Sequence, residues 1–286
     1  MEISGKTIVC GVIGDPVDHS MSPAMQNAAF REANLDYVYV ALRVAAGDVG
    51  NAIAGMRALG LRGLNVTIPH KLSVIPFLDK LDDLAEKIGA VNTIVNDSGV
   101  LTGYNTDAAG FLRPLLERGF EPRGKRVVVL GAGGAARGIT FALASRGAFI
   151  KILNRTAERA NQLAQQLCAS FPGQADGFGI NEDLLGEALK SADMVVNTTS
   201  VGMGAGQNAT VVPRRYLRRD VWVYDIVYNP LRTRLVSEAD EQGCTVITGA
   251  EMLAWQGALA FEKWTLRQAP IDVMKKELIR QLTHED

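Results

Sequence analysis

The sequence has few of the residues that build disulfide frameworks and metal centres. It contains three cysteines in 286 residues, and Cys10, Cys168 and Cys244 lie too far apart for a CxxC motif. An odd, dispersed set gives no complete disulfide framework, so we expect a reducing compartment, the cytoplasm. Histidine is equally scarce, with three residues and no paired arrangement, and therefore no bound metal is expected.

Long apolar runs and an excess of one charge are also missing. No apolar stretch approaches the roughly 20 residues needed to span a bilayer, and residues 1–14 lack the apolar core of a signal peptide. The 30 Lys and Arg residues stand against 31 Asp and Glu, which gives a formal net charge of -1 without a long basic tract. We therefore expect neither a membrane nor a nucleic acid as a partner.

What the sequence does contain is a repeated alternation of short apolar runs with longer segments of helical period. This alternation is typical of βαβ units around a mostly parallel sheet. The pattern occurs twice and restarts after the polar turn at residues 121–125. It predicts an α/β protein of two domains, an N-terminal α/β domain and a doubly wound domain of the Rossmann type.

Several local signals predict where helices and turns begin. Ser22 is expected to cap a helix that has Pro23 in its first position, and Thr106 is expected to cap the helix that follows it. Residues 79–88 have helical character, whereas residues 96–99 have the composition of a hairpin turn between two strands.

A glycine-rich turn stands between the strongest predicted strand and an alanine-rich helix. In this position the glycines permit a tight turn and a close approach of the backbone to a pyrophosphate, while the helix N-terminus stabilises the anion. Ala136 occupies the third position of the GxGxxG pattern, a tolerated variant. The predicted cofactor-binding residues of the turn are Gly131, Ala132, Gly133, Gly134 and Ala135.

The end of the next predicted strand indicates which dinucleotide is bound. An NAD site normally has Asp or Glu here to accept a hydrogen bond from the ribose 2′-hydroxyl. This chain instead has Asn154, Arg155 and Thr156, followed by Arg159. Two arginines four residues apart can donate charge-assisted hydrogen bonds to a 2′-phosphate, so NADP is expected rather than NAD.

Clusters of polar residues follow the predicted strands, and these clusters indicate which family the chain resembles. Four lie in the first half and two near the end: residues 20–23, 65–71, 91–93, 103–107, 225–230 and 249–256. In order and spacing, from about Val12 to Thr265, these motifs closely resemble the shikimate dehydrogenase family. One departure is Gln26, which stands where the family often has His, and we expect it to affect local packing.

The resemblance implies an NADP-linked oxidoreductase that acts on a small molecule. No side chain can store a hydride, so a nicotinamide takes it while the protein supplies the acid/base groups. By resemblance Lys71 and Asp107 are the catalytic pair at the reacting hydroxyl, with the lysine as the acid/base. Further substrate contacts are implied for Ser20, Ser22, Thr67, Asn92, Tyr228 and Gln256, and further cofactor contacts for Asp83, Thr199, Ile226, Gly249 and Met252.

The predicted function is the reversible NADPH-linked reduction of 3-dehydroshikimate to shikimate in aromatic amino-acid biosynthesis. Because Gln256 is implied to reach the substrate, we expect residues 1–107 plus 255–286 to form the substrate domain, residues 108–254 the NADP-binding domain, and a cleft between them. The alternatives are a quinate/shikimate dehydrogenase that uses NAD and a non-catalytic metabolite sensor. The sequence leaves the oligomeric state open, with a homodimer as one expectation.

Overall fold

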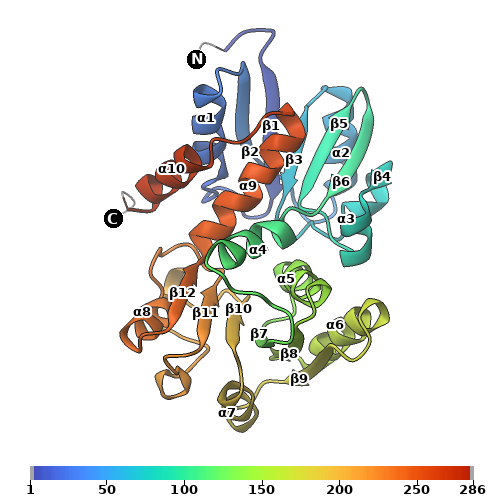
Figure 1. The fold of residues 1–286 in the computed structure, drawn as a ribbon. Helices are drawn as coiled ribbons and strands as arrows, with labels where there is room; N and C mark the ends of the chain where they lie inside the picture. The colour runs from blue at the N-terminus through green and yellow to red at the C-terminus, as the bar shows by residue number, and fades with distance from the viewer. Residues whose placement is uncertain (1–2, 284–286) are drawn as a thin grey trace. The chain divides into compact units, whose positions relative to one another are not determined.

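The computed structural model describes residues 3–283 and contains two compact units (Figure 1). One unit consists of residues 3–110 and 254–283, and the other of residues 111–253. The boundaries between the units fall within two helices, α4 (Asp107–Glu117) and α9 (Gly249–Thr265). Each unit is built around its own six-stranded sheet.

The first sheet is mixed, and it brings several strand ends to one edge. Its strands in spatial order are β2 (Tyr37–Arg43), β1 (Ile8–Gly14), β3 (Gly63–Val66), β5 (Thr93–Asp97), β6 (Val100–Tyr104) and β4 (Lys80–Leu81). β5 is antiparallel to both β3 and β6, while β1 is parallel to β2 and β3. The carboxyl ends of β1, β3 and β6 therefore meet the amino end of β5.

The turn between β5 and β6 is the predicted hairpin. Asp97 pairs with Val100, so the connection has two residues, Ser98 and Gly99, and their φ values are +53° and +93°. Positive φ at both central positions is the type I′ geometry, whose twist matches that of the flanking strands.

Both faces of the first sheet are covered by helices, and alternate strand residues face opposite sides. Leu64 of β3 packs with apolar residues of α2 (Val49–Ala58). On the other face, a Cβ on Gly63 would lie 2.0 Å from Nε1 of Trp264 on α9. Helix α1 (Ser22–Glu32) joins this face and packs against α10 (Ile271–Thr283).

The second sheet is parallel throughout and doubly wound. Its strands in spatial order are β12 (Thr245–Thr248), β11 (Trp222–Asp225), β10 (Met194–Asn197), β7 (Arg126–Leu130), β8 (Phe149–Asn154) and β9 (Ala175–Gly179). The helices between them are α5 (Gly134–Ser145), α6 (Ala157–Ser170), α7 (Glu182–Lys190) and α8 (Arg234–Glu241). The chain reverses direction across the sheet between β7 and β10, the arrangement of a dinucleotide-binding fold.

Two helix caps differ from the sequence prediction. Ser22 lies inside α1, Met21 holds the N-cap position, and no side chain caps that end. Thr106 does not cap α4: the Ala108 amide donates to Oδ1 of Asn105 at 3.2 Å. The hydroxyl of Thr106 instead forms hydrogen bonds with the buried side chain of Asn92, so it does not cap the helix.

The prediction of one helix over residues 79–88 was wrong. Strand β4 comes first, and α3 (Asp83–Ile88) begins only after Asp82, whose carboxylate accepts from the Ala85 amide at 2.8 Å. Residues 3–283 also contain three 3-10 helices: η1 (Ile75–Phe77), η2 (Gly204–Gly206) and η3 (Arg214–Tyr216).

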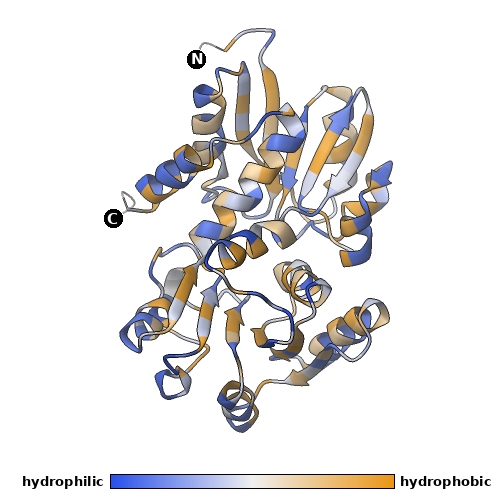
Figure 2. Ribbon diagram, in the orientation of Figure 1, coloured by the Kyte–Doolittle hydropathy of each residue, from blue (hydrophilic) through white to orange (hydrophobic). Residues whose placement is uncertain are grey.

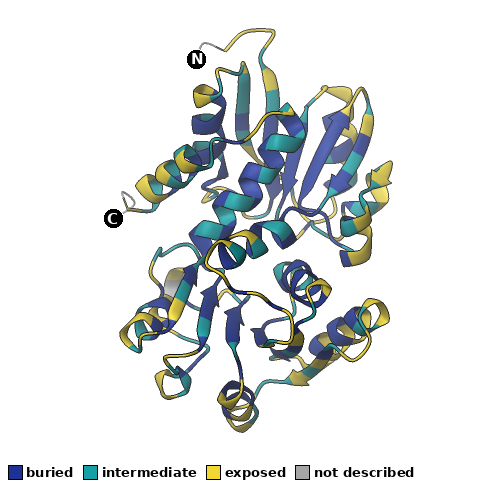
Figure 3. Cartoon of the chain, in the orientation of Figure 1, coloured by how far each residue is buried: buried dark blue, intermediate teal, exposed yellow. Residues whose placement is uncertain are grey.

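The core of each unit lies along its sheet. Figure 2 shows the central strands as largely hydrophobic, and Figure 3 shows the same strands as buried. Within residues 3–283, no helix combines the length and apolar character needed to cross a membrane. The described residues also contain no group of three His, Cys, Asp or Glu side chains placed to hold a metal ion.

Candidate active site

The predicted catalytic pair forms at the carboxyl edge of the first sheet. Nζ of Lys71 donates to Oδ2 of Asp107 at 2.5 Å. The two side chains are 15% and 7% exposed, so the pair is shielded on most sides yet the ammonium keeps some access to solvent. A charge-assisted hydrogen bond of this length fixes the direction of the lysine.

The backbone holds both members of the pair. The Val91 amide donates to the carbonyl of Lys71 at 2.8 Å, which ties the segment after β3 to the segment before β5. Asp107 is the first residue of α4 and is separated from the end of β6 by Asn105 and Thr106. The neighbouring His70 is buried, and its Nε2 lies 2.7 Å from the Val44 carbonyl, a structural contact away from the pair.

Asn92 links the pair to the rest of the cluster. Its Nδ2 donates to Oδ1 of Asp107 and to Oγ1 of Thr106, both at 2.9 Å, and lies 3.4 Å from Oε1 of Gln256. Its Oδ1 accepts from the Thr106 amide at 2.7 Å. The structure thus brings Lys71, Asn92, Asp107 and Gln256 together, although Gln256 is 164 residues from Asn92 in the chain.

The remaining predicted substrate residues of this unit follow neighbouring strands. Ser20 and Ser22 come after β1, and the Ser22 amide donates to Oγ of Ser20 at 3.3 Å. Thr67 directly follows β3, and its amide donates to the Ile13 carbonyl at 2.9 Å. Because β1 and β3 are adjacent and parallel, the segments that carry these residues leave the sheet at the same edge as the segment that carries Lys71.

Three buried polar residues that were not predicted as site residues support this cluster. Tyr39 donates to Oδ1 of Asn65 at 2.7 Å, and Nδ2 of Asn65 donates to Oγ1 of Thr93 at 3.0 Å. One feature of the sequence could have indicated this buried network: Tyr39 lies in the middle of an apolar strand, and a buried phenol requires a hydrogen-bond partner.

Gln26 affects local packing, as expected. The side chain is fully buried, and its Nε2 donates to the carbonyl of Gly257 on α9 at 2.9 Å. A Cβ on Gly257 would lie 2.4 Å from Cε of Met25, so α1 and α9 approach each other closely at this position.

The glycine turn of the second unit fits a dinucleotide. Gly131 has φ +109°, and a Cβ there would lie 2.5 Å from Oγ1 of Thr198, so only glycine suits this position. By contrast, a Cβ on Gly133 would meet nothing within 4 Å, which leaves its backbone open to a ligand. Ala132, Gly134 and Ala135 complete the turn at the N-terminus of α5.

The predicted phosphate-binding residues follow β8. Arg155 and Arg159 are exposed, and no ion pair within residues 3–283 involves either of them. Nδ2 of Asn154 donates to the Thr156 carbonyl at 2.9 Å, which closes the turn in front of α6. Cations are therefore available beside the carboxyl end of a strand, where a doubly wound sheet binds its ligand.

A buried network connects the ends of β10 and β11. Nδ2 of Asn197 donates to Oδ1 of Asp225 at 2.9 Å, and Oδ2 of Asp225 accepts from Thr233 at 2.6 Å. Oδ1 of Asn197 accepts from the hydroxyl of Thr199 at 2.7 Å. Burial raises the pKa of Asp225, and the hydrogen bonds from Thr233, the Val227 amide and Asn197 oppose that rise.

The other predicted cofactor residues lie in different units, with Ile226, Gly249 and Met252 in the second and Asp83 in the first. A Cβ on Gly249 would lie 2.2 Å from the Ile226 carbonyl oxygen, so these two are in contact, and Met252 is buried on the same helix as Gly249. Tyr228, which was predicted to contact the substrate, is half-buried after β11. Asp83 is exposed at the start of α3 in the other unit, and its contact stays a prediction.

These features are typical of one class of protein, the dinucleotide-dependent oxidoreductases, and Lys71 with Asp107 is a candidate acid/base pair. Three family descriptions match successive parts of the chain. They are the shikimate dehydrogenase substrate binding domain over residues 12–94, shikimate / quinate 5-dehydrogenase over residues 115–223, and the shikimate 5'-dehydrogenase C-terminal domain over residues 249–279.

Individual proteins agree with these matches. A relative from Dehalococcoides mccartyi (strain CBDB1), named shikimate dehydrogenase (NADP(+)), is 49% identical over 267 residues, 93% of each chain. A crystal structure of a shikimate dehydrogenase with NADP+ has a TM-score of 0.92 and 41% identity, with 98% of both chains covered. A shikimate 5-dehydrogenase from Listeria monocytogenes in complex with shikimate and NAD has a TM-score of 0.91 and 40% identity, covering 97% of this chain and 98% of that one.

The chain belongs to the shikimate dehydrogenase family. The family and the α/β fold class predicted from the motifs are thereby confirmed.

Proposed function

We propose that the protein is an NADP-dependent shikimate dehydrogenase that reversibly reduces the C3 carbonyl of 3-dehydroshikimate. The observation that carries this proposal is the Lys71 and Asp107 pair, joined to Asn92 and Gln256 at one sheet edge. The high identity to proteins named NADP(+) shikimate dehydrogenases supports the choice of substrate and cofactor.

When bound, NADPH would supply the hydride that the carbonyl carbon receives in the reduction. Lys71 gives a proton from Nζ to the carbonyl oxygen as negative charge develops there. Oδ2 of Asp107 accepts from the ammonium and fixes its direction, and Nδ2 of Asn92 donates to Oδ1 of the same carboxylate. In the oxidation the same lysine nitrogen accepts the hydroxyl proton, and the oxidised cofactor, when bound, would take the hydride from the carbon.

Neutral donors and acceptors surround this charged pair. We assign Ser20 and Ser22 to the substrate carboxylate, and Thr67, Asn92 and Gln256 to ring hydroxyls, with Tyr228 as a further contact. A site of fixed polar groups rejects analogues that lack a partner, because each missing hydroxyl leaves a buried group unpaired.

We assign NADP to the second unit. The open backbone at Gly133 and the helix end behind it would hold the pyrophosphate, and Arg155 and Arg159 would hold the 2′-phosphate. Residues 1–107 with 255–286 would then be the substrate domain and residues 108–254 the NADP-binding domain. We place the protein in the cytoplasm, which agrees with its three free cysteines, and leave a homodimer as an open proposal.

A quinate/shikimate dehydrogenase that uses NAD is the second candidate. A structural relative in complex with shikimate and NAD favours it, whereas the two arginines after β8 count against it. A non-catalytic metabolite sensor would need neither the lysine and aspartate pair nor the complete glycine turn, and both are present.

The test is to measure reduction of NADP and of NAD by absorbance, with shikimate and with quinate in parallel. We expect turnover with shikimate and NADP to exceed that of every other combination. Equal rates with the two cofactors would overturn the assignment of the arginines. Faster turnover of quinate with NAD would establish the second candidate, and no turnover with any pair would favour the sensor.

A further inference from the structure

Gly14, the last residue of β1, lies against Thr67, one of the residues proposed to contact the substrate. A Cβ on Gly14 would be 2.4 Å from Cγ2 of Thr67. Non-bonded carbon atoms pack at about 3.5 to 4.0 Å, so the two groups could not coexist. Gly14 is buried, and its φ lies outside the left-handed region, so its backbone conformation is open to alanine. The absence of a side chain at residue 14 therefore leaves room for the Thr67 methyl group.

The backbones of the two segments are tied together on both sides of Gly14. The Thr67 amide donates to the Ile13 carbonyl at 2.9 Å. The Asp15 amide donates to the Ile68 carbonyl at 3.0 Å, and both bonds extend the parallel pairing of β1 and β3. The segments cannot separate at residue 14 without losing these hydrogen bonds. A new side chain there would therefore displace the Thr67 side chain instead.

The methyl group and the hydroxyl of Thr67 are attached to the same carbon. The three staggered positions around the Cα–Cβ bond are therefore occupied in a fixed order by the methyl group, the hydroxyl and a hydrogen. The methyl group occupies the position next to Gly14. This arrangement assigns the hydroxyl to one particular position of the other two, so the direction of the hydroxyl depends on the space at residue 14.

The Thr67 hydroxyl is available to a ligand. Thr67 is half-buried, and within residues 3–283 its hydroxyl forms no hydrogen bond. The hydroxyls of Thr93 and Thr106 differ in this respect, because both form hydrogen bonds with the side chain of Asn92. Since no hydrogen bond from the described residues fixes the direction of the Thr67 hydroxyl, the packing of its methyl group against Gly14 does so.

We propose that Gly14 is a positioning residue that keeps the Thr67 hydroxyl in the direction of the substrate. This inference rests on the proposed function, because it requires Thr67 to contact a ring hydroxyl of shikimate. An alanine at residue 14 would exclude the Thr67 methyl group from its present position. In the staggered arrangement that leaves only a hydrogen there, the methyl group takes the place of the hydroxyl, and the hydroxyl turns away.

The test compares the variant Gly14→Ala with wild type in shikimate oxidation with NADP. We expect kcat/KM for shikimate to fall about fivefold, the value of one neutral hydrogen bond, with KM for NADP unchanged. Thr67→Val, which keeps the shape of threonine and lacks its hydroxyl, should show a fall of similar size. Gly55→Ala is the matched control, because a Cβ at this position of α2 would meet nothing within 4 Å, and its kinetics should equal those of wild type.

A second substitution separates positioning from a general defect. Serine has the hydroxyl without the methyl group, so Gly14→Ala combined with Thr67→Ser allows a hydroxyl in the original direction. We expect kcat/KM of this double variant to lie within about twofold of Thr67→Ser alone, a rescue that a general defect would not show. Wild-type kinetics in Gly14→Ala or in Thr67→Val would overturn the inference, and so would a double variant no more active than Gly14→Ala.

Should Gly14→Ala fail to fold, the double variant decides. Folding and activity restored by Thr67→Ser support the inference, whereas a double variant that also fails to fold overturns it, because the obstruction would then not be the Thr67 methyl group.

The activity of the wild type distinguishes this inference from the proposed function. Wild-type turnover of shikimate with NADP together with normal kinetics in Gly14→Ala rejects only the role of Gly14. An absence of wild-type turnover rejects the proposed function itself.

Discussion

At the scale of single residues, the site depends on polar side chains that each have a fixed partner. The amide of Asn92 makes contacts at both of its ends, and this orientation fixes which oxygen of Asp107 remains for Lys71. Buried polar groups are costly to leave unpaired, so a change at one position is transmitted to its neighbours. The following two predictions depend on such individual groups.

Replacement of Lys71 by alanine should lower kcat by about 100-fold or more, because a positioned acid/base group typically contributes 10²-fold to 10⁴-fold. Steady-state kinetics with shikimate and NADP measure this effect. Lys80→Ala, which removes an exposed lysine from β4, is the control and should behave as wild type. A nearly normal kcat in Lys71→Ala would place the proton transfer on another group.

Replacement of Arg155 by alanine should raise KM for NADP about tenfold while leaving KM for NAD nearly unchanged. The reason is the loss of a charge-assisted hydrogen bond that only the 2′-phosphate can receive. The matched control is Arg146→Ala, which removes an exposed arginine at the C-terminal end of α5, the end opposite the glycine turn. An equal rise for both cofactors would contradict a role in recognising the phosphate.

At the scale of elements, loops after neighbouring strands are tied together by side chains. The carboxylate of Asp225 at the end of β11 binds Asn197 at the end of β10 and Thr233 at the start of α8. Asn197 in turn binds the hydroxyl of Thr199. The loops that carry Thr199 and Ile226 are therefore held by a single buried carboxyl group.

Asp225→Asn should change the pH dependence of stability. Because burial raises the pKa of Asp225 above its ordinary value of 3.8, the folded state holds the proton more tightly than the unfolded chain. The contribution of Asp225 to the free energy of unfolding is fully present at pH values below the pKa of this group in the unfolded chain. It is lost as the pH rises through the pKa of the group in the folded protein. The variant removes this loss, so its stability relative to wild type should increase as pH rises above about 4.

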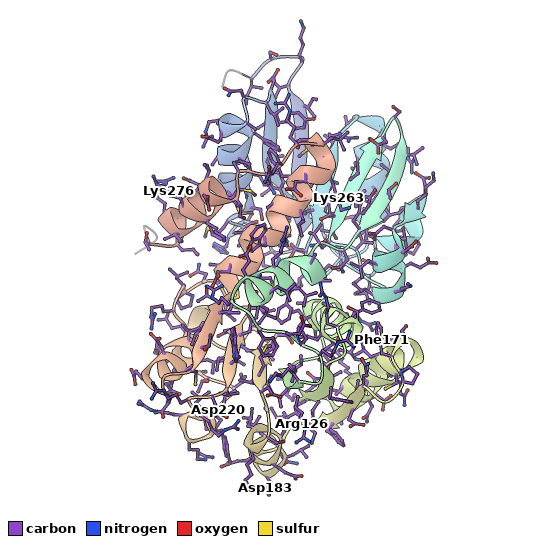
Figure 4. The ribbon with its side chains drawn as sticks, in the orientation of Figure 1. Arg126, Phe171, Asp183, Asp220, Lys263 and Lys276 are labelled. Atoms are coloured by element: carbon purple, nitrogen blue, oxygen red, sulfur yellow. The ribbon has the colours of Figure 1, made fainter. Side chains whose placement is uncertain are left out.

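Urea denaturation at several pH values measures this difference. Asp220→Asn is the control of opposite sign: Asp220, labelled in Figure 4, precedes β11, and the hydrogen bond from Arg218 lowers its pKa. Its favourable contribution is present above 3.8 and is lost as pH falls. Parallel pH profiles for wild type and Asp225→Asn would contradict the titration of Asp225.

The elements also show which features the sequence could predict. Asn96 to Gly99 predicted the hairpin because turn composition is a local property, and the glycine turn was predicted for the same reason. The cap roles of Ser22 and Thr106 were wrong, since tertiary hydrogen bonds decide how a hydroxyl is used. The contacts of Tyr39 could not be predicted either, because they depend on which strands are adjacent.

At the scale of the whole molecule, most of the proposed shikimate contacts lie in the first unit and most of the proposed NADP contacts lie in the second. We therefore expect shikimate and NADP each to raise Tm alone, because a ligand at 100 times its Kd adds about 2.7 kcal/mol to stability. Thermal unfolding with each ligand measures this. Ser22→Ala should reduce the shift caused by shikimate and keep the shift caused by NADP, and a loss of both would indicate a general defect.

The two units also differ in how their residues are distributed along the chain. Residues 111–253 are contiguous, whereas the first unit needs contacts such as Trp264 with Ile94 and Gln26 with Gly257, which span 170 and 231 residues. During synthesis at roughly 5 to 20 residues per second, the first part must wait on the order of ten seconds for its last helices. The second unit can therefore fold first, and the polar cluster around Asn92 is completed only when Gln256 has left the ribosome.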